Sequence, residues 1–103
     1  ASLVGLKRSE EARSLLRKTI PVARRVLGES YECTLRMRSM YALALYEDPD
    51  ATLDDLNEAV TTLEDVGRIA RRVFGGAHPL TKGIEGDLRQ ALAALRAREA
   101  SNA

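Results

Sequence analysis

The stretch ARRVLG at residues 23–28 returns as ARRVFG at residues 70–75, which lies 47 positions further along the chain. The match extends outward in the same register, and ten of 30 aligned positions are identical between residues 6–35 and residues 53–82. Self-similarity at a fixed period in this range is typical of helical repeat proteins, in which each unit stacks on its neighbours. The sequence therefore predicts a translational repeat of helices.

Apolar residues at helical spacing indicate four helices, and the chain carries no strand signal. We expect them over residues 9–27, with a start near Leu3 as the alternative, and over residues 33–46, 53–74 and 79–100. Their inward faces predict a core. Its expected members are Leu16, Ala23, Val26, Met40, Ala44, Leu45, Leu56, Leu63, Ile69, Val73, Leu88 and Leu92.

Local signals mark where these helices begin and end. Gly28 and Gly75 are good C-terminal stops, because glycine readily adopts the left-handed conformation there. Thr52 and the acids after it resemble a capping box. Pro79 fits the first turn of the last helix, where its missing donor is harmless. Pro21 lies inside the first helix, and we expect it to bend that helix without ending it, since the apolar stripe continues.

The composition describes a single domain over residues 1–103 with a formal net charge of only +1. This balance argues against a nucleic-acid binder, which usually has a strong basic excess. No apolar run approaches the roughly 18 residues that a membrane-spanning helix needs, so membrane insertion is not expected. The one cysteine, Cys33, allows no internal disulfide, and we expect a cytoplasmic or other reducing compartment.

The two inter-helix turns point to a family. Residues 27–35, LGESYECTL, and residues 74–81, FGGAHPLT, resemble the inter-repeat turn of kinesin-light-chain-type tetratricopeptide repeats. In that family a Leu-Gly, a short linker, His-Pro and a Thr join one repeat to the next. The second copy is the closer match, because Tyr31-Glu32 replaces His-Pro in the first. The period of 47 exceeds the usual tetratricopeptide period of about 34, which we assign to the longer third helix and the linker at residues 47–50.

The resemblance implies an all-α fold, with four antiparallel helices stacked as a short right-handed solenoid. In this register the chain holds a half-repeat at residues 3–28, a full repeat at 33–74 and a half-repeat at 79–100. A simple up-down four-helix bundle is the alternative, but a bundle needs no translational repeat. The outer faces of an interrupted solenoid are normally apolar and need covering.

The expected function is a non-catalytic protein–protein interaction or scaffolding module. The resemblance implies that a peptide or protein partner docks on the concave face formed largely by the shorter helices. The alternative is a structural subunit or homo-oligomer that assembles through its open half-repeat ends. The family often places asparagines on these inner helices, and the matching positions here are Met40 and Asp87. The candidate partner-binding residues, which we expect to be exposed on that face, are Arg36, Arg38, Ser39, Tyr46, Lys82, Glu85, Arg89 and Arg96.

No catalytic, metal or cofactor site is expected. His78, the only histidine, lacks the companions of a ligand cluster or a catalytic pair, so we interpret it as part of the turn before the last helix. We interpret Cys33 as a small buried residue at the first turn. The acidic run in residues 47–55 lacks the spacing and the central glycine of a calcium loop, which favours a solvated linker and helix start.

Charge divides the chain into blocks. Residues 1–45 carry +5, residues 46–66 carry −8 and residues 67–103 carry +4. The two long helices have opposite charges at aligned positions. These pairs are Lys7 with Asp54, Arg8 with Asp55, Arg17 with Glu64, and Lys18 with Asp65. We expect them to face each other within the chain, or between molecules in a head-to-tail assembly, where they would fix register more than stability. Arginines 24, 25, 71 and 72, with Arg36, Arg38 and Arg68, form a second candidate surface for acidic ligands, although dipole complementation at helix ends explains the first four equally well.

Overall fold

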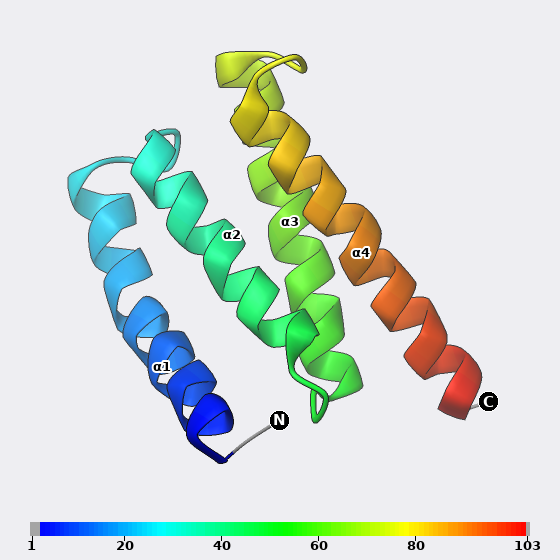
Figure 1. Cartoon of the computed structure of the whole chain (residues 1–103). Coiled ribbons are helices and arrows are strands. Elements are labelled where there is room, and N and C mark those ends of the chain that lie inside the picture. Colours follow the sequence, from blue (N-terminus) through cyan, green and yellow to red (C-terminus); the bar gives the residue numbers. More distant parts are fainter. Residues whose placement is uncertain (1–2, 103) are drawn as a thin grey trace.

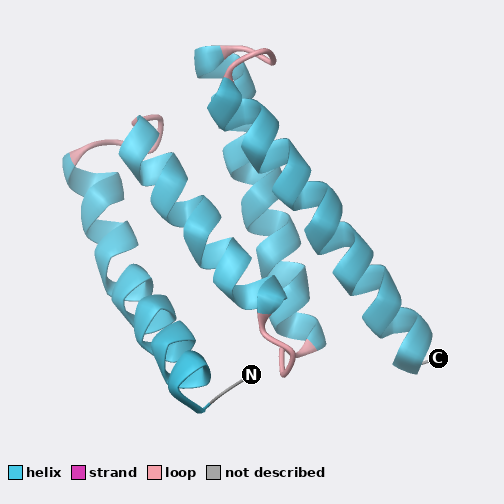
Figure 2. Cartoon of the chain, in the orientation of Figure 1, coloured by secondary structure: helices cyan, strands magenta, loops and turns pink. Residues whose placement is uncertain are grey.

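A computed structural model of the chain contains four helices joined by short turns (Figures 1 and 2). It describes the backbone of residues 3–102 and the side chains of residues 10–101. The helices are α1 (Leu3–Val26), α2 (Glu32–Glu47), α3 (Leu53–Phe74) and α4 (Pro79–Asn102). Consecutive helices run antiparallel. The predicted all-α fold of four helices packed in sequence is confirmed.

The predicted start and stop signals act as expected. Thr52 accepts a hydrogen bond from the Asp55 backbone N–H and the Asp55 side chain accepts from the Thr52 N–H, which closes a capping box at the start of α3. Gly28 and Gly75 have φ angles of 96° and 91°, in the region that favours glycine. His78 Nδ1 accepts from the Leu80 N–H at 3.1 Å, so its imidazole satisfies a donor in the first turn of α4.

Helix α1 is continuous through Pro21 and begins at Leu3. A start at Ser9 is therefore wrong, and the alternative start is correct. Proline lacks only its own N–H and clashes with one preceding turn, so a long helix with a continuing apolar stripe tolerates it. Whether Ser9 makes side-chain contacts lies outside the described residues.

The helices form an open row and not a closed bundle. Within the described residues, α2 packs against α1, α3 and α4, and α3 packs against α4, whereas α1 makes close backbone approaches to α2 alone. Figure 1 shows α1 and α4 at opposite edges of the row. A four-helix bundle would bring α1 and α4 together, so the alternative fold is wrong. Contacts between α2 and α4, two helices of the same type, are what stacking of successive repeats requires.

The core lies around α3, which has neighbours on two sides. Leu63, Val66 and Ala70 of α3 are fully buried, together with Leu35 and Leu45 of α2. The other buried members come from α2, α3 and α4: Tyr41, Ala42, Ala59, Val60, Leu80, Ile84 and Ala91. Burial of such side chains stabilises a fold by roughly 1.5–3 kcal/mol each, so α3 with its neighbours forms most of the stable unit.

Three residues predicted for the core are exposed. Val26 is 71% exposed, Met40 is 57% exposed and Val73 is 46% exposed. Val26 lies at the end of α1, where no further helix covers it, and Met40 lies at the rim of a surface groove described below. Ala44 is half-buried. The remaining predicted members are buried or pack against the core: Leu16, Ala23, Leu45, Leu56, Leu63, Ile69, Leu88 and Leu92.

The expected charge pairs between α1 and α3 do not form within the chain where the structure describes both side chains. Asp65 contacts Arg38 and Arg68, each at 2.8 Å, and not Lys18. Arg17 donates to the Tyr41 hydroxyl at 3.1 Å and not to Glu64. Because α2 lies between α1 and α3, the aligned charges are separated by a helix. The pairs of Lys7 and Arg8 lie outside the described side chains.

Candidate partner-binding groove

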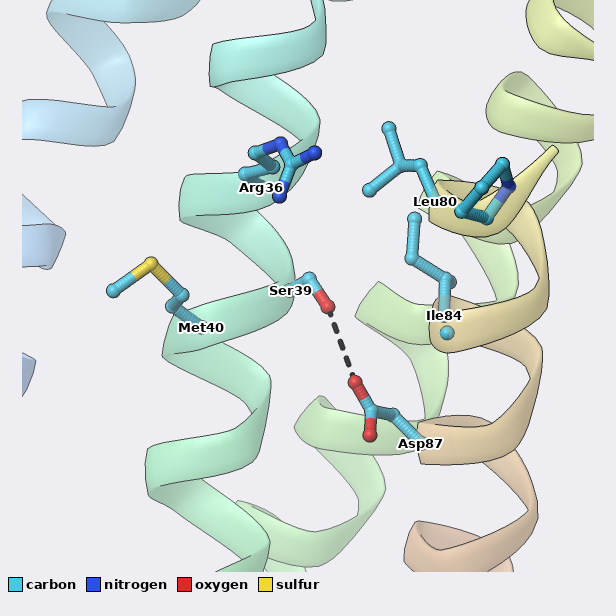
Figure 3. Close-up of a pocket in the computed structure, with 8 residues that line it drawn as sticks. Arg36, Ser39, Met40, Leu80, Ile84 and Asp87 are labelled. Atoms are coloured by element: carbon cyan, nitrogen blue, oxygen red, sulfur yellow. Dashed lines mark hydrogen bonds between the residues drawn. The ribbon is translucent and has the colours of Figure 1, made fainter.

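A groove of about 330 Å³ runs between α2 and α4 (Figure 3). The candidate partner-binding residues predicted from the resemblance belong to these two helices, although only α2 is short, with 16 residues against 24 in α4. Residues of both helices line it: Arg36, Ser39 and Met40 from α2, and Pro79, Leu80, Gly83, Ile84 and Asp87 from α4. A shallow cleft with apolar walls and a few polar groups is the usual form of a binding site.

The polar centre of the groove is the pair Ser39 and Asp87. The Ser39 hydroxyl donates to Asp87 Oδ2 at 3.5 Å across the two helices, as Figure 3 shows. Burial raises the pKa of the Asp87 carboxyl, and the weaker effect of the Ser39 hydrogen bond opposes it. A half-buried carboxylate with one long hydrogen bond has acceptor capacity left, so Asp87 is suited to receive a donor from a ligand.

Apolar and open surfaces flank this centre. Leu80 and Ile84 line the groove on α4, and only 9% and 2% of their surfaces are exposed. Gly83 lies between them in the sequence, and a Cβ added there would meet no atom within 4 Å, so a larger side chain at this position would extend into open space. Met40 extends away from α4 in Figure 3 and forms an exposed, flexible rim.

Charged and aromatic groups close the two ends. At one end Arg36 points into the space between the helices and also donates to Glu32 at 3.0 Å. Beyond the other end the Tyr46 hydroxyl donates to Gln90 Oε1 at 3.0 Å, which ties α2 to α4. Burial, with smaller effects from the Asp87 and Glu47 charges, raises the pKa of Tyr46 to about 12, so this phenol stays protonated at neutral pH.

The candidate residues of α2 divide between two sides of that helix. Arg36 and Ser39 line the groove, and Tyr46 lies at its end. The expectation that Arg38 is exposed is wrong, because this side chain is buried and forms an ion pair with Asp65 on α3. Ser39 is also largely buried, although its hydroxyl reaches Asp87.

The candidate residues of α4 do not line the groove. At 100° per residue, Lys82, Glu85, Arg89 and Arg96 lie between about 100° and 160° around the helix from Ile84. They therefore share one side of α4, which is not the side that α2 contacts. Glu85 accepts two hydrogen bonds from Arg71 on α3, at 3.0 and 3.2 Å.

Sequence reasoning missed the apolar part of the groove. Leu80, Gly83 and Ile84 were not candidates, because charged residues were preferred as binding groups. The aligned positions Met40 and Asp87, which the family resemblance singles out, do both line the groove. The helical wheel of α4 carries the missed signal, since Leu80, Gly83 and Asp87 fall on one side of Ile84.

A smaller hollow of about 190 Å³ lies beside α1. Its lining residues are Arg17, Ile20, Pro21, Arg24, Arg38, Tyr41 and Thr62. Arg17 of α1 donates to the Tyr41 hydroxyl, and Arg13 contacts Asp48 at 3.5 Å, so two arginines attach α1 to α2. Burial raises the pKa of Tyr41, against the hydrogen bond from Arg17, which lowers it.

The remaining residues singled out from the sequence lie in the turns and at the helix starts. The His78 ring stacks on Phe74 with centroids 4.8 Å apart and caps α4, as described above. The expectation that Cys33 is buried is wrong, because this thiol is exposed at the start of α2. Asp48 Oδ1 accepts from the Asp50 N–H within the α2–α3 turn. The described residues contain no group of histidine, cysteine and acidic side chains that could hold a metal ion, and none of their helices is long and apolar enough to span a membrane.

These observations define a helical-repeat chain with a groove between two helices of the same type. The family model for the tetratricopeptide repeat matches residues 1–30, which include α1 and part of the turn that follows it. The resemblance to kinesin-light-chain-type tetratricopeptide repeats is thus confirmed over this part of the chain. No curated protein and no solved structure gives a significant match.

Proposed function

We propose that the chain is a non-catalytic interaction module that holds an extended peptide segment of a partner protein in the groove between α2 and α4. A tetratricopeptide repeat implies a protein-interaction module, and the match at residues 1–30 supports that class. The observation that supports this particular site is the Asp87 carboxylate, partly buried between the two helices and flanked by the apolar side chains of Leu80 and Ile84.

The groove chemistry selects a type of peptide. An apolar side chain fits against Leu80 and Ile84, and a lysine side chain or a backbone N–H fits Asp87 as the donor. Met40 at the rim adapts to the shape of the bound side chain. Arg36 disfavours a second cation at its own end of the groove, so one end of the peptide is expected to be neutral or acidic.

Two glycines of α4 give a matched pair of variants. Gly83 lines the groove, whereas Gly86 does not, and a Cβ at Gly86 would lie 3.6 Å from the Arg89 guanidinium. Both lie inside the same helix, so replacing either with glutamine improves helix propensity to the same extent, by roughly 0.5–1 kcal/mol. Gly83→Gln fills the groove and Gly86→Gln does not.

Peptides selected from a random phage-displayed library provide the ligands, and fluorescence anisotropy provides the affinity. We expect Gly83→Gln to weaken the selected peptides by about tenfold or more, while Gly86→Gln binds as the wild type does. Asp87→Asn should weaken peptides that carry a lysine more than peptides that lack one. Equal binding to all three variants would show that the peptides use another surface, and the proposed site would be wrong.

A further inference from the structure

The outer side of α1 is apolar and open. Leu15 is 65% exposed, Val22 is 46% exposed and Val26 is 71% exposed. With Thr19 they follow each other at spacings of three and four, so they form one stripe along the helix, which we call the α1 stripe. Figure 1 shows α1 at the edge of the row with α2 on one side only.

The copy of α1 within the chain shows what covers such a stripe. In the 47-residue register Leu15 corresponds to Thr62 of α3, and Val22 corresponds to Ile69. Asp65 of α3 contacts Arg38 of α2 at 2.8 Å, and Thr62 and Ile69 lie three positions before and four positions after Asp65, on the same side of α3. The side of α3 that corresponds to the α1 stripe is therefore the side that α2 covers. An α2-type helix is the occupant that the stripe fits.

The chain has a second α2-type helix, namely α4. Thr34 near the start of α2 corresponds to Thr81 near the start of α4, and both are fully buried. Helix α2 has three neighbours within the described residues, whereas α4 packs only on α2 and α3. The side by which α2 holds α3 is thus uncovered on α4. That side carries Glu85 with the half-buried Leu88 and Leu92.

The ion pair between α2 and α3 shows whether the charges at the corresponding positions of α4 and α1 would attract each other. Arg38 of α2 contacts Asp65 of α3 at 2.8 Å. Moving Arg38 forward by 47 positions gives Glu85 on α4, and moving Asp65 back by 47 gives Lys18 on α1. Both signs are exchanged, so the corresponding pair between α4 of one copy and α1 of another is again attractive.

Glu85 can accept this second cation. Asp65 already accepts from two arginines, Arg38 and Arg68, each at 2.8 Å. Glu85 accepts from Arg71 of its own chain, and it occupies the position on α4 that Arg38 occupies on α2. A carboxylate has about four acceptor sites, so it can bind Arg71 and a lysine together.

Pairing of α1 with α1 of another copy is unfavourable. Four of the nine residues from 17 to 25 are basic, namely Arg17, Lys18, Arg24 and Arg25, and none is acidic. Two such helices packed face to face would place like charges together, and of these four bases only Arg24 forms an ion pair in the described structure, with Glu29. The mixed face of α4, with Glu85 and Glu99 among its bases, is the better match.

We propose that the α1 stripe is the docking surface for α4 of a second copy of this chain, with Lys18 beside Glu85 of the neighbour. The helix row then continues from one molecule to the next, in the arrangement that α2 and α3 adopt inside the chain. The interface is heterologous, since it uses different surfaces on the two copies, so assembly proceeds head to tail without a fixed limit unless a ring closes. This surface is separate from the peptide groove, and neither proposal depends on the other.

Two valines test the apolar part. Val22 belongs to the α1 stripe and its copy Ile69 packs against the core, whereas Val73 is an exposed valine of α3 that the proposed interface does not use. Sedimentation equilibrium should show a mass that rises with concentration for the wild type and for Val73→Ser. Val22→Ser should need about a tenfold higher concentration for the same mass. A constant monomer mass for the wild type, or equal effects of both substitutions, would overturn the proposal.

A charge exchange tests the register. Lys18→Glu places two acids together at the interface and Glu85→Lys places two bases together, so each variant alone should assemble less than the wild type. An equimolar mixture restores an attractive pair at every interface, and its average mass should return towards that of the wild type. A mixture that assembles no better than its components would contradict this register. Thermal unfolding of each variant verifies that the fold is intact.

Cross-linking distinguishes pairing of α1 with α4 of a second copy from pairing of α1 with another α1. In a Cys33→Ser background, oxidation of a Lys18→Cys, Glu85→Cys variant should give a ladder of covalent multimers. Lys18→Cys with Ala97→Cys, whose second position is exposed on another side of α4, is the matched control and should give few. A covalent dimer from Lys18→Cys alone would indicate symmetric pairing through α1 and would overturn the proposal. Gly83→Gln should leave the ladder unchanged, which separates assembly from peptide binding.

Discussion

Helices α1 and α3 are copies of one sequence in different surroundings. They share the ARRV segment, a following glycine and leucines at two aligned positions, 6 with 53 and 16 with 63. Within the described residues, α1 has only α2 beside it, whereas α3 has both α2 and α4. Their corresponding leucines differ accordingly, because Leu63 is fully buried and Leu16 is half-buried. In a repeat protein the stability of a unit depends on its neighbours, so the same residue type has a different energetic effect in each copy.

The largest contrast is expected for these two leucines. Leu63→Ala should lower the free energy of unfolding by about 3 kcal/mol, because it leaves a cavity between three helices. Leu16→Ala should lower it by about 1 kcal/mol, because its site already contacts solvent. Urea denaturation monitored by circular dichroism measures both. Equal losses would show that α1 is as enclosed as α3.

The next contrast in stability concerns Asp65 of α3 and Lys18, which has the opposite charge at the corresponding position of α1. Asp65→Ala leaves the buried Arg38 guanidinium without its partner and should destabilise the fold by about 2 kcal/mol. Lys18→Ala at the corresponding position of α1 removes an exposed charge, and a change within about 0.5 kcal/mol is expected. The same denaturation experiment in dilute solution compares them. A neutral effect of Asp65→Ala would mean that the ion pair does not orient Arg38.

A pH profile separates the charge of Asp65 from its shape. Burial raises the pKa of this carboxyl, but the hydrogen bonds and charges of Arg38 and Arg68 outweigh burial and lower it overall. A pKa below the unfolded value means that ionised Asp65 adds stability above about pH 4, and that this stability is lost as the pH falls through the folded-state pKa. Asp65→Asn should therefore lose less stability than the wild type between about pH 5 and pH 2.

The control is Lys18→Met at the corresponding position of α1, which leaves every carboxyl of the chain in place and should keep the acid profile of the wild type. Thermal unfolding across the pH series gives the measurement. Parallel profiles for Asp65→Asn and the wild type would show that another carboxyl governs acid sensitivity.

The smallest effect on stability is expected for two corresponding threonines, in α2 and α4, that are equally buried. Thr34 and Thr81 are fully buried, and neither hydroxyl has a hydrogen-bond partner in the described structure. Valine has the same shape without the hydroxyl, so Thr34→Val and Thr81→Val should each change stability by between about 0 and +1 kcal/mol. Differential scanning calorimetry resolves such shifts. A loss above about 1 kcal/mol in either variant would reveal a hydrogen bond that the hydroxyl makes in solution.

The sequence predicts the fold more completely than it predicts the binding site. Helix boundaries followed from Thr52, the two glycines and Pro79, whose effects are local and depend little on packing. Burial depended on which helices are neighbours, and that is why Val26 and Met40 were assigned to a core that does not reach them. An apolar residue at helical spacing indicates the inner side of a helix, but it does not show whether another helix covers that side.

The sequence predicts which two helices form the groove, but not most of the residues that line it. The resemblance indicated α2 and α4 as the binding helices, and Arg36 and Ser39 do line the space between them. The charged residues chosen on α4 lie on another side, because the rotation of α4 about its axis depends on close packing such as that of Ile84 on α3 at Gly67, where an added Cβ would lie 3.4 Å from Ile84. Such packing details are not readable from one sequence.

Native-state hydrogen exchange of the amides in α1 and α3 tests most directly the claim that neighbouring helices determine how firmly each of these two copies is held. In dilute solution, where copies do not cover each other, amides of α3 should exchange only through global unfolding. Amides of α1 should exchange through local opening, with a free energy lower by about 2 kcal/mol. Equal protection of corresponding positions such as Ala23 and Ala70 would contradict the account, because α1 would then be as firmly held as α3.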